Sequence, residues 1–265
     1  MKSLLAAILG IIVPLAHGQE IVTLNARTGA TASFLLIAPK DAPPRAAAVL
    51  FPGGPGNIRL RTEDGQIRFG PNNFVVRSRG LFVAGGVAIA IVDAPSDQSS
   101  GMNNSFRKGE LHLQDVKAVV GEIKKRFSST PVFLVGTSMG TVSAAYIGRA
   151  LENEVAGVAL TSSPFLPSGR RSAHGDSNLS DFDLSRIKAP LLIVHHREDA
   201  CLICPYGEAQ RRAGNIPLIS VAGGKPPISD PCEALSAHGY LGKEDETVEA
   251  VVNWMLKRPY RSEIN

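Results

Sequence analysis

Short apolar segments alternate along the chain with segments of helical periodicity, and this alternation is the feature that most restricts the fold. Continuous apolar runs of four to six residues are typical of strands buried on both faces of a sheet. Helices between such strands produce a mostly parallel sheet with helices on both of its faces. The apolar segments expected to form these strands are 46–51, 87–92, 132–135, 155–160, 191–194 and 218–221.

Two further strands are expected at the start, over 21–26 and 32–38, joined by a turn at Thr28-Gly29 into an antiparallel edge hairpin. The prediction is therefore an α/β fold with a sheet of about eight strands. Helices are expected over 74–84, 110–127, 141–151, 205–213 and 246–256. The polar stretch 161–188 has no long periodic segment and is predicted to form a short cap over the carboxyl ends of the strands.

The amino-terminal 18 residues have the pattern of a signal peptide. Lys2 precedes an apolar run over 4–15, and the small residues of Ala16-His17-Gly18 suit cleavage before Gln19. About twelve apolar residues are too few to cross a bilayer, which takes about 20. We therefore expect a periplasmic or secreted protein with one domain over 19–265 and no membrane span in the mature chain.

The 265-residue chain has a formal net charge of +4, but its basic residues are scattered. Their densest cluster, Lys124-Lys125-Arg126, falls at a helix end, where cations suit the helix dipole. No basic stripe interleaved with aromatic residues accompanies it, so nucleic acid is not expected as a partner. His, Asp and Glu residues show no metal-ligand spacing, so neither a metal nor another cofactor is expected.

A strand, a sharp turn and a helix surround the sequence Gly136-Thr137-Ser138-Met139-Gly140. In a G-x-S-x-G turn the serine adopts a strained conformation, and the glycines let strand and helix approach closely. The hydroxyl of Ser138 is then raised above the sheet at a helix amino end. With this motif in this context, the chain resembles the α/β-hydrolase superfamily, and the resemblance covers essentially all of the mature sequence.

The resemblance implies a serine nucleophile, Ser138, followed along the chain by an acid and then a histidine. The acid should follow a late strand, where Glu198 and Asp199 are candidates, and Asp199 is preferred because similar sequences have an Asp a few residues before a Pro. His238 is the single histidine after Asp199, and Gly239 would allow the backbone to crowd the site. His195 and His196 are adjacent near a strand end, so their side chains should point in opposite directions.

The oxyanion of the reaction needs two backbone donors. Met139 N–H is expected to supply one, and the loop Pro52-Gly53-Gly54-Pro55-Gly56 the other, with Gly54 preferred over Gly53. A Pro stands where related hydrolases often have a His. Asp93 ends a strand at the same edge and is expected to cap a turn rather than line the pocket.

All three cysteines lie in the last quarter of the chain, and export permits a disulfide. Cys232 is expected to pair with either Cys204 or Cys201, which would connect the loop of Asp199 to the loop of His238. The Cys201-x-x-Cys204 spacing also occurs in redox proteins, but here it follows a late strand rather than opening a small βαβ domain.

The expected function is that of an exported serine hydrolase that cleaves an ester, thioester or amide of a small to medium acyl substrate. Carboxylesterase-type activity is the preferred form of this expectation. Two alternatives stay open. One is a small peptidase of the prolyl-oligopeptidase kind, and the other is a binding protein that keeps the hydrolase fold without catalysis.

Overall fold

The structure is a computed structural model that describes residues 18–169 and 178–265. The predicted signal peptide lies outside these residues except for Gly18, as does part of the predicted cap. No helix within the described ranges is long and apolar enough to cross a membrane.

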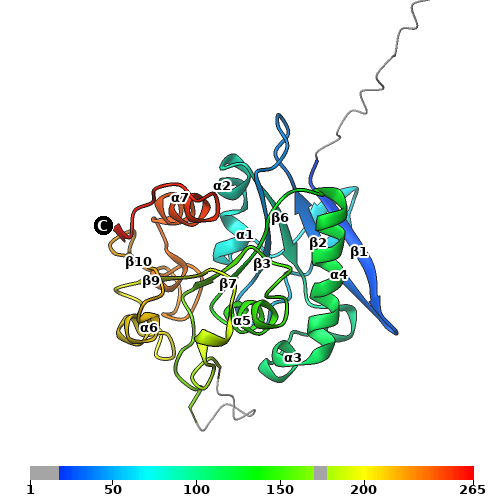
Figure 1. Cartoon of the computed structure of the whole chain (residues 1–265). Helices are drawn as coiled ribbons and strands as arrows, with labels where there is room; N and C mark the ends of the chain where they lie inside the picture. Colours follow the sequence, from blue (N-terminus) through cyan, green and yellow to red (C-terminus); the bar gives the residue numbers. More distant parts are fainter. Residues whose placement is uncertain (1–17, 170–177) are drawn as a thin grey trace, which may run out of the picture.

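A nine-stranded sheet forms the centre of the molecule (Figure 1), in the order β1-β2-β6-β3-β7-β8-β9-β10-β11. Its strands are β1 (Glu20–Arg27), β2 (Ala30–Ile37), β3 (Ala46–Phe51), β6 (Val87–Val92), β7 (Val132–Thr137), β8 (Gly157–Thr161), β9 (Leu191–His196), β10 (Leu218–Val221) and β11 (Glu263–Ile264). The β1–β2 and β2–β6 pairs are antiparallel, and every other pair is parallel. The eight predicted strands and the mostly parallel sheet are confirmed, and β11 adds a short ninth strand.

The helices observed are α1 (Phe74–Arg77), α2 (Arg79–Ala84), α3 (Asn104–Lys108), α4 (Glu110–Arg126), α5 (Gly140–Ala150), α6 (Tyr206–Ala213) and α7 (Glu244–Met255). The prediction of one helix over 74–84 is wrong, because the backbone at Ser78 (φ −85°, ψ 3°) leaves the helical region and separates α1 from α2. The sequence analysis missed α3 and the small hairpin of β4 (Arg61–Glu63) and β5 (Gln66–Arg68).

Both faces of the sheet are covered, as the apolar runs predict. Along β3, Ala47, Val49 and Phe51 belong to one core cluster with buried residues of α4, α5 and α6. Ala46, Ala48 and Leu50 point the other way, into a second cluster with α1, α2 and α7. Every residue of β3 is buried, so no side chain of this strand reaches solvent.

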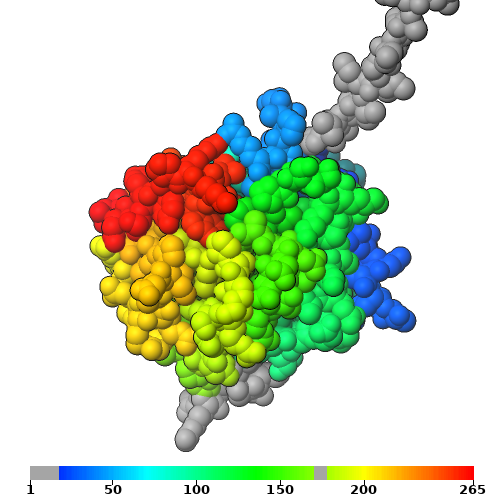
Figure 2. Space-filling view, in the orientation of Figure 1, coloured from blue at the N-terminus to red at the C-terminus, as the bar shows by residue number. Residues whose placement is uncertain are grey.

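The antiparallel hairpin of β1 and β2 lies at one edge of the sheet, and its turn projects from the body of the molecule (Figure 2). The parallel strands β3, β6, β7, β8, β9 and β10 run in a common direction, so their carboxyl ends meet at one edge. In open α/β sheets this edge is where ligands bind. The loops that follow β3, β7, β9 and β10 carry the candidate site residues.

Candidate active site

Ser138 follows β7 directly and precedes α5 by two residues. Its φ of 51° is positive, a conformation that a non-glycine residue adopts only under local constraint. The glycines around it are required by space, because a Cβ on Gly136 would lie 2.5 Å from Gly140 O, and one on Gly140 would lie 2.1 Å from Phe51 O. The strand, turn and helix predicted around Ser138 are therefore present, with its hydroxyl at the amino end of a helix.

Asp199 and His238 are brought together from two different loops. Nδ1 of His238 lies 2.8 Å from Oδ2 of Asp199, and both side chains are buried. The other carboxylate oxygen of Asp199 accepts a hydrogen bond of 2.9 Å from Cys201 N–H. The carboxylate is thus fixed by its own loop and in turn orients the imidazole.

The charge of Asp199 is set by opposing effects. Burial favours its neutral form, but hydrogen bonds from His195 and His238 outweigh burial and hold the pKa of Asp199 below its ordinary value. Nε2 of His195 lies 3.5 Å from Oδ2 of Asp199. Asp199 is therefore ionised at neutral pH, as a group that stabilises a neighbouring imidazolium must be.

The loop that carries His238 is anchored at the histidine and at the two residues that follow it. Ser162 Oγ donates to His238 O at 2.7 Å, and Tyr240 Oη donates to Val194 O at 2.9 Å. The Arg77 guanidinium donates to Gly239 O. A Cβ on Gly239 would lie 1.9 Å from Ala234 O, so the expected crowding of the backbone beside the histidine is present.

Ser138 and His238 lie on the wall of the same pocket, which has a volume of about 320 Å³ and is also lined by Gly53, Asn73, Ile203 and Glu233. Because Nδ1 of His238 faces Asp199, Nε2 is the nitrogen left for a reaction. Nε2 is buried and has no hydrogen-bond partner among the described residues. No hydrogen bond joins it to Ser138 here; in unliganded hydrolases such contacts are often long and tighten when substrate binds.

The loop after β3 lies against Ser138. A Cβ on Gly53 would lie 3.0 Å from Ser138 Cβ and 3.0 Å from Thr137 O, so glycine is needed at this position. Gly54 has a φ of 57° and also lines the pocket. Within the described residues, the N–H groups of Gly53, Gly54 and Met139 donate to no other protein group. These three predicted donors are therefore free for an oxygen atom in the pocket.

Beneath this loop lies Arg107, a residue that the sequence analysis did not select. The residue is 1% exposed, and its guanidinium donates to Gly54 O and to Ser143 Oγ, each at 2.9 Å. No carboxylate pairs with it among the described residues, and burial lowers its pKa to about 10. A lone Arg in a five-residue helix has no sequence signal that would have identified it.

The other residues considered in the sequence analysis bind backbone groups near the site and do not line the pocket. His195 Nε2 and His196 Nε2 contact backbone oxygens of Cys204 and Gly223 on opposite sides of β9. Asp93 accepts from Ile58 N–H and Leu60 N–H at 2.7 Å and so caps a loop instead of lining the pocket. The 59% exposed side chain of Glu198 accepts from Gly223 N–H.

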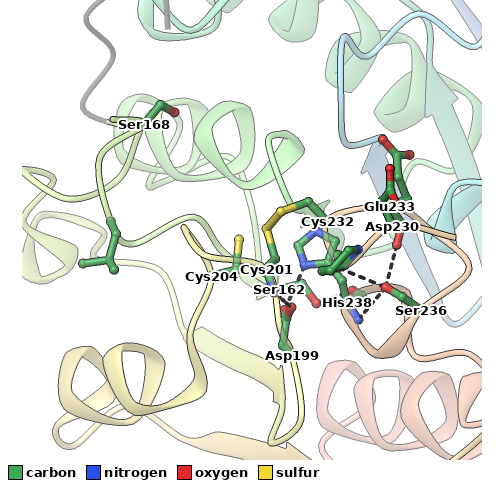
Figure 3. The surroundings of a disulfide bond; sticks show 12 residues. Ser162, Ser168, Asp199, Cys201, Cys204, Asp230, Cys232, Glu233, Ser236 and His238 are labelled. Carbon is green, nitrogen blue, oxygen red and sulfur yellow. Dashed lines mark hydrogen bonds and ion pairs between the residues drawn. A yellow bond between two sulfur atoms is a disulfide. The ribbon is translucent and has the colours of Figure 1, made fainter. Parts of the chain in front are cut away.

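Of the two disulfide pairings left open by the sequence, the structure has Cys201 bonded to Cys232 (Figure 3). The bond connects the loop of Asp199 to the loop of His238. Cys204 is a free thiol, and burial, with the nearby charge of Asp199, raises its pKa well above the ordinary value. An exposed pair of thiols at Cys201 and Cys204, which a redox enzyme would need, is not present.

Comparison with known proteins supports the same superfamily. The family model of the S33 serine aminopeptidases matches residues 83–180, a segment that contains Ser138 but neither Asp199 nor His238. No curated protein matches the sequence.

Solved structures are similar over nearly the whole chain. A serine hydrolase without a lid from Xanthomonas campestris is 16% identical, with a TM-score of 0.59, and the match covers 90% of this chain and 94% of that one. Est1E from Butyrivibrio proteoclasticus, bound to ferulic acid, is 17% identical, with a TM-score of 0.61 and coverage of 89% and 98%. An α/β serine hydrolase homologue from Coxiella burnetii is 16% identical, with a TM-score of 0.58 and coverage of 88% and 96%. The chain therefore has the α/β-hydrolase fold, in agreement with the family resemblance of its sequence.

Proposed function

We propose that this protein is a serine hydrolase that cleaves an ester, thioester or amide of a small to medium acyl compound through an acyl-enzyme on Ser138. The observation that carries the proposal is that His238, oriented by Asp199, lies on the wall of the same pocket as the strained Ser138. A strained serine beside a carboxylate-oriented imidazole is the arrangement that serine hydrolases use for acyl transfer.

In the proposed reaction, Nε2 of His238 takes the proton of Ser138 as the hydroxyl attacks the acyl carbon, and then returns it to the leaving group. Asp199 keeps the proton of the neutral imidazole on Nδ1 and stabilises the imidazolium. The N–H groups of Met139 and of Gly54, or of Gly53, receive the oxyanion. Removing one such donor in a serine hydrolase lowers kcat by about 10²–10³-fold.

Among these substrates we favour carboxylic esters. The pocket is small, at about 320 Å³, and the described part of the predicted cap contains only a single 3₁₀ turn, Leu184–Arg186. One protein of similar fold is a serine hydrolase without a lid, and another binds ferulic acid. A pocket of this size suits a compact acyl group better than an extended chain.

The matching aminopeptidase family favours a second candidate, a small peptidase that uses the same residues. Amide and ester substrates distinguish the two. Aminoacyl p-nitroanilides and a series of p-nitrophenyl esters of increasing length are compared by kcat/KM. Higher kcat/KM on the anilides would replace the esterase proposal with the peptidase.

A fluorophosphonate probe tests the proposal as a whole. It should label the purified wild-type protein at Ser138, and Ser138→Ala should remain unlabelled while it keeps the wild-type circular dichroism spectrum. The matched control is Ser185, an exposed serine outside the pocket whose N–H and hydroxyl donate to the Asp183 side chain. Ser185→Ala should therefore be labelled as wild type is. A folded wild-type protein that the probe does not label would favour the binding-protein alternative.

We also propose that the protein is exported to the periplasm or secreted. The disulfide supports this, because such bonds persist mainly in oxidising compartments. The mass of the chain isolated from its native compartment should correspond to a protein that begins at Gln19. An intact amino terminus on the mature protein would contradict export by cleavage.

A further inference from the structure

The corner of the site that contains the disulfide also contains a third sulfur and the imidazole of His238. One ligand atom from each of Cys201, Cys204 and His238 lies within 4.8 Å of the other two, and all three residues are buried. Cys204 and Cys201 lie side by side in Figure 3, with Cys232 on the other side of the bond. The proposed hydrolysis uses none of these sulfurs.

We propose that reduction of the Cys201–Cys232 disulfide creates a site for one thiophilic divalent cation, Zn²⁺ above all. Its ligands are the thiolates of Cys201 and Cys204, Nε2 of His238 and the released Cys232. A dithiol or phosphine reductant supplies two electrons, the S–S bond breaks, and the two sulfurs take up two protons. The cation then displaces the thiol protons as it binds.

The ligand types and their spacing fit zinc. Three cysteines and one histidine form a common structural zinc set, and two cysteines separated by two residues are the usual first half of such a site. Tetrahedral zinc with bonds of about 2.0–2.3 Å separates its ligand atoms by about 3.5–3.8 Å. One ring nitrogen of His238 and the two sulfurs now lie within 4.8 Å of one another, so the three residues would have to close by about 1 Å around the cation.

Three of the four ligands are held in place without the disulfide. Cys201 and Cys204 belong to one turn, closed by a hydrogen bond of 2.9 Å from Cys204 N–H to Cys201 O. Asp199 accepts from Cys201 N–H and contacts Nδ1 of His238, so it connects this turn to the imidazole. Breaking the S–S bond therefore frees Cys232 but leaves the other three ligands in position.

The imidazole is already prepared as a ligand. Metal-bound histidines usually donate their second N–H to a carboxylate, which fixes the tautomer and makes the ligating nitrogen more basic. Asp199 has this position toward His238, and the remaining nitrogen, Nε2, is buried and unpartnered among the described residues. In the oxidised protein Cys201 is blocked by its bond to Cys232, so only Cys204 and His238 remain, and no tight binding is expected.

Binding is measured on the full mature chain reduced with a phosphine and loaded with Zn²⁺. After gel filtration, elemental analysis should find one zinc per reduced chain and none per oxidised chain. Co²⁺ in place of Zn²⁺ should give a thiolate-to-metal charge-transfer band and the strong visible bands of tetrahedral cobalt. Equal metal content in the oxidised and reduced proteins, or a weak octahedral cobalt spectrum, would overturn the proposal.

Variants separate a folded site from thiols of an unfolded chain. In the reduced protein, Cys204→Ser and His238→Ala should each weaken zinc binding at least tenfold. Asp199→Asn should weaken it by about 10–100-fold through loss of the oriented imidazole. An unfolded chain would be insensitive to Asp199→Asn, so equal affinity of this variant and wild type would contradict the folded site.

One consequence rests on the proposed function. A cation on Nε2 of His238 occupies the lone pair that would take the proton of Ser138, so zinc should stop hydrolysis by the reduced protein and a chelator should restore it. Ser138→Ala should bind zinc as wild type does. Zinc binding by Ser138→Ala therefore tests the metal site independently of hydrolase activity. The same measurement on the wild-type protein stays valid even if that protein shows no hydrolysis.

Discussion

The guanidinium of Arg107 donates a hydrogen bond of 2.9 Å to the carbonyl oxygen of Gly54, 53 residues away along the chain. The same guanidinium occupies the space beside Gly56, where a Cβ would lie 2.5 Å from Nη2. Arg107 thereby fixes the loop that is proposed to supply an oxyanion donor. Its buried charge has no carboxylate partner among the described residues, so it also favours negative charge in the neighbouring pocket.

Arg107→Met should therefore lower kcat by about 10–100-fold with little change in KM. This decrease is smaller than the one expected from removing an oxyanion donor, because Arg107 acts only through Gly54. Arg107→Lys keeps the charge and should recover part of this loss. Steady-state kinetics on the best p-nitrophenyl ester, with thermal unfolding in parallel, provide the measurement. A lower melting temperature with unchanged kcat would show that Arg107 only stabilises the fold.

Asp199→Asn should lower kcat by about 10⁴-fold, since an amide holds the imidazole in the wrong tautomer and does not stabilise its charged form. The matched control is Glu198→Gln, one residue away. Its side chain is 59% exposed and accepts from Gly223 N–H, which a glutamine oxygen can also do. Glu198→Gln should keep kcat close to wild type, and a loss as large as that of Asp199→Asn would reassign the acid.

The sequence predicted the fold because its strands are buried on both faces. Continuous apolar runs such as 46–51 leave few alternatives, and the strand, turn and helix around Ser138 follow from the glycines that the turn needs. The order of nucleophile, acid and histidine came from family resemblance and not from geometry. The contact between Asp199 and His238 depends on two loops whose conformations the residues alone do not specify.

The elements that the sequence analysis missed are short and polar. The hairpin of β4 and β5 is almost entirely exposed, so it has no apolar alternation, although Asp64-Gly65 at its turn is a hairpin signal. Helix α3 has five residues, too few to display a period, and begins where the Asn103 side chain accepts from Phe106 N–H. Arg107 in this helix became visible as a site residue only through its tertiary contacts.

His112 should make the stability of the protein depend on pH. Burial, followed by the charges of Arg107 and Arg27, lowers the pKa of His112 to about 3. Nε2 of His112 lies 3.0 Å from Ser143 Oγ, which accepts from the Arg107 guanidinium, so a proton added to His112 would place a second positive charge beside that of Arg107. In the unfolded chain His112 has an ordinary pKa of about 6.5.

Between these two values the unfolded state binds a proton that the folded state does not, so the contribution of His112 to stability is complete above about pH 6.5 and is lost as the pH falls. Because of His112, the free energy of unfolding should fall by up to about 1.4 kcal/mol for each unit by which the pH is lowered in this range. Urea unfolding at about pH 4, 5 and 6 should give a shallower dependence for His112→Gln than for wild type. Parallel dependences would mean that His112 is protonated in the folded protein.

The disulfide should stabilise the fold by restricting the unfolded chain. Cys201 and Cys232 are 31 residues apart, and closing a loop of this length contributes about 3–4 kcal/mol in the chain-entropy account. Cys201→Ala/Cys232→Ala should therefore lower the melting temperature by roughly 7–15 °C.

Cys204→Ala is the control for this double variant, because it removes a buried sulfur and keeps the bond. The double variant should keep a kcat close to wild type, since Asp199 contacts both Cys201 N–H and Nδ1 of His238 whether or not the bond is present. If the double variant and Cys204→Ala unfold at the same urea concentration, the bond adds nothing to stability beyond packing. A kcat far below the wild-type level would mean that the contact of Asp199 with His238 does not by itself maintain the geometry of the site.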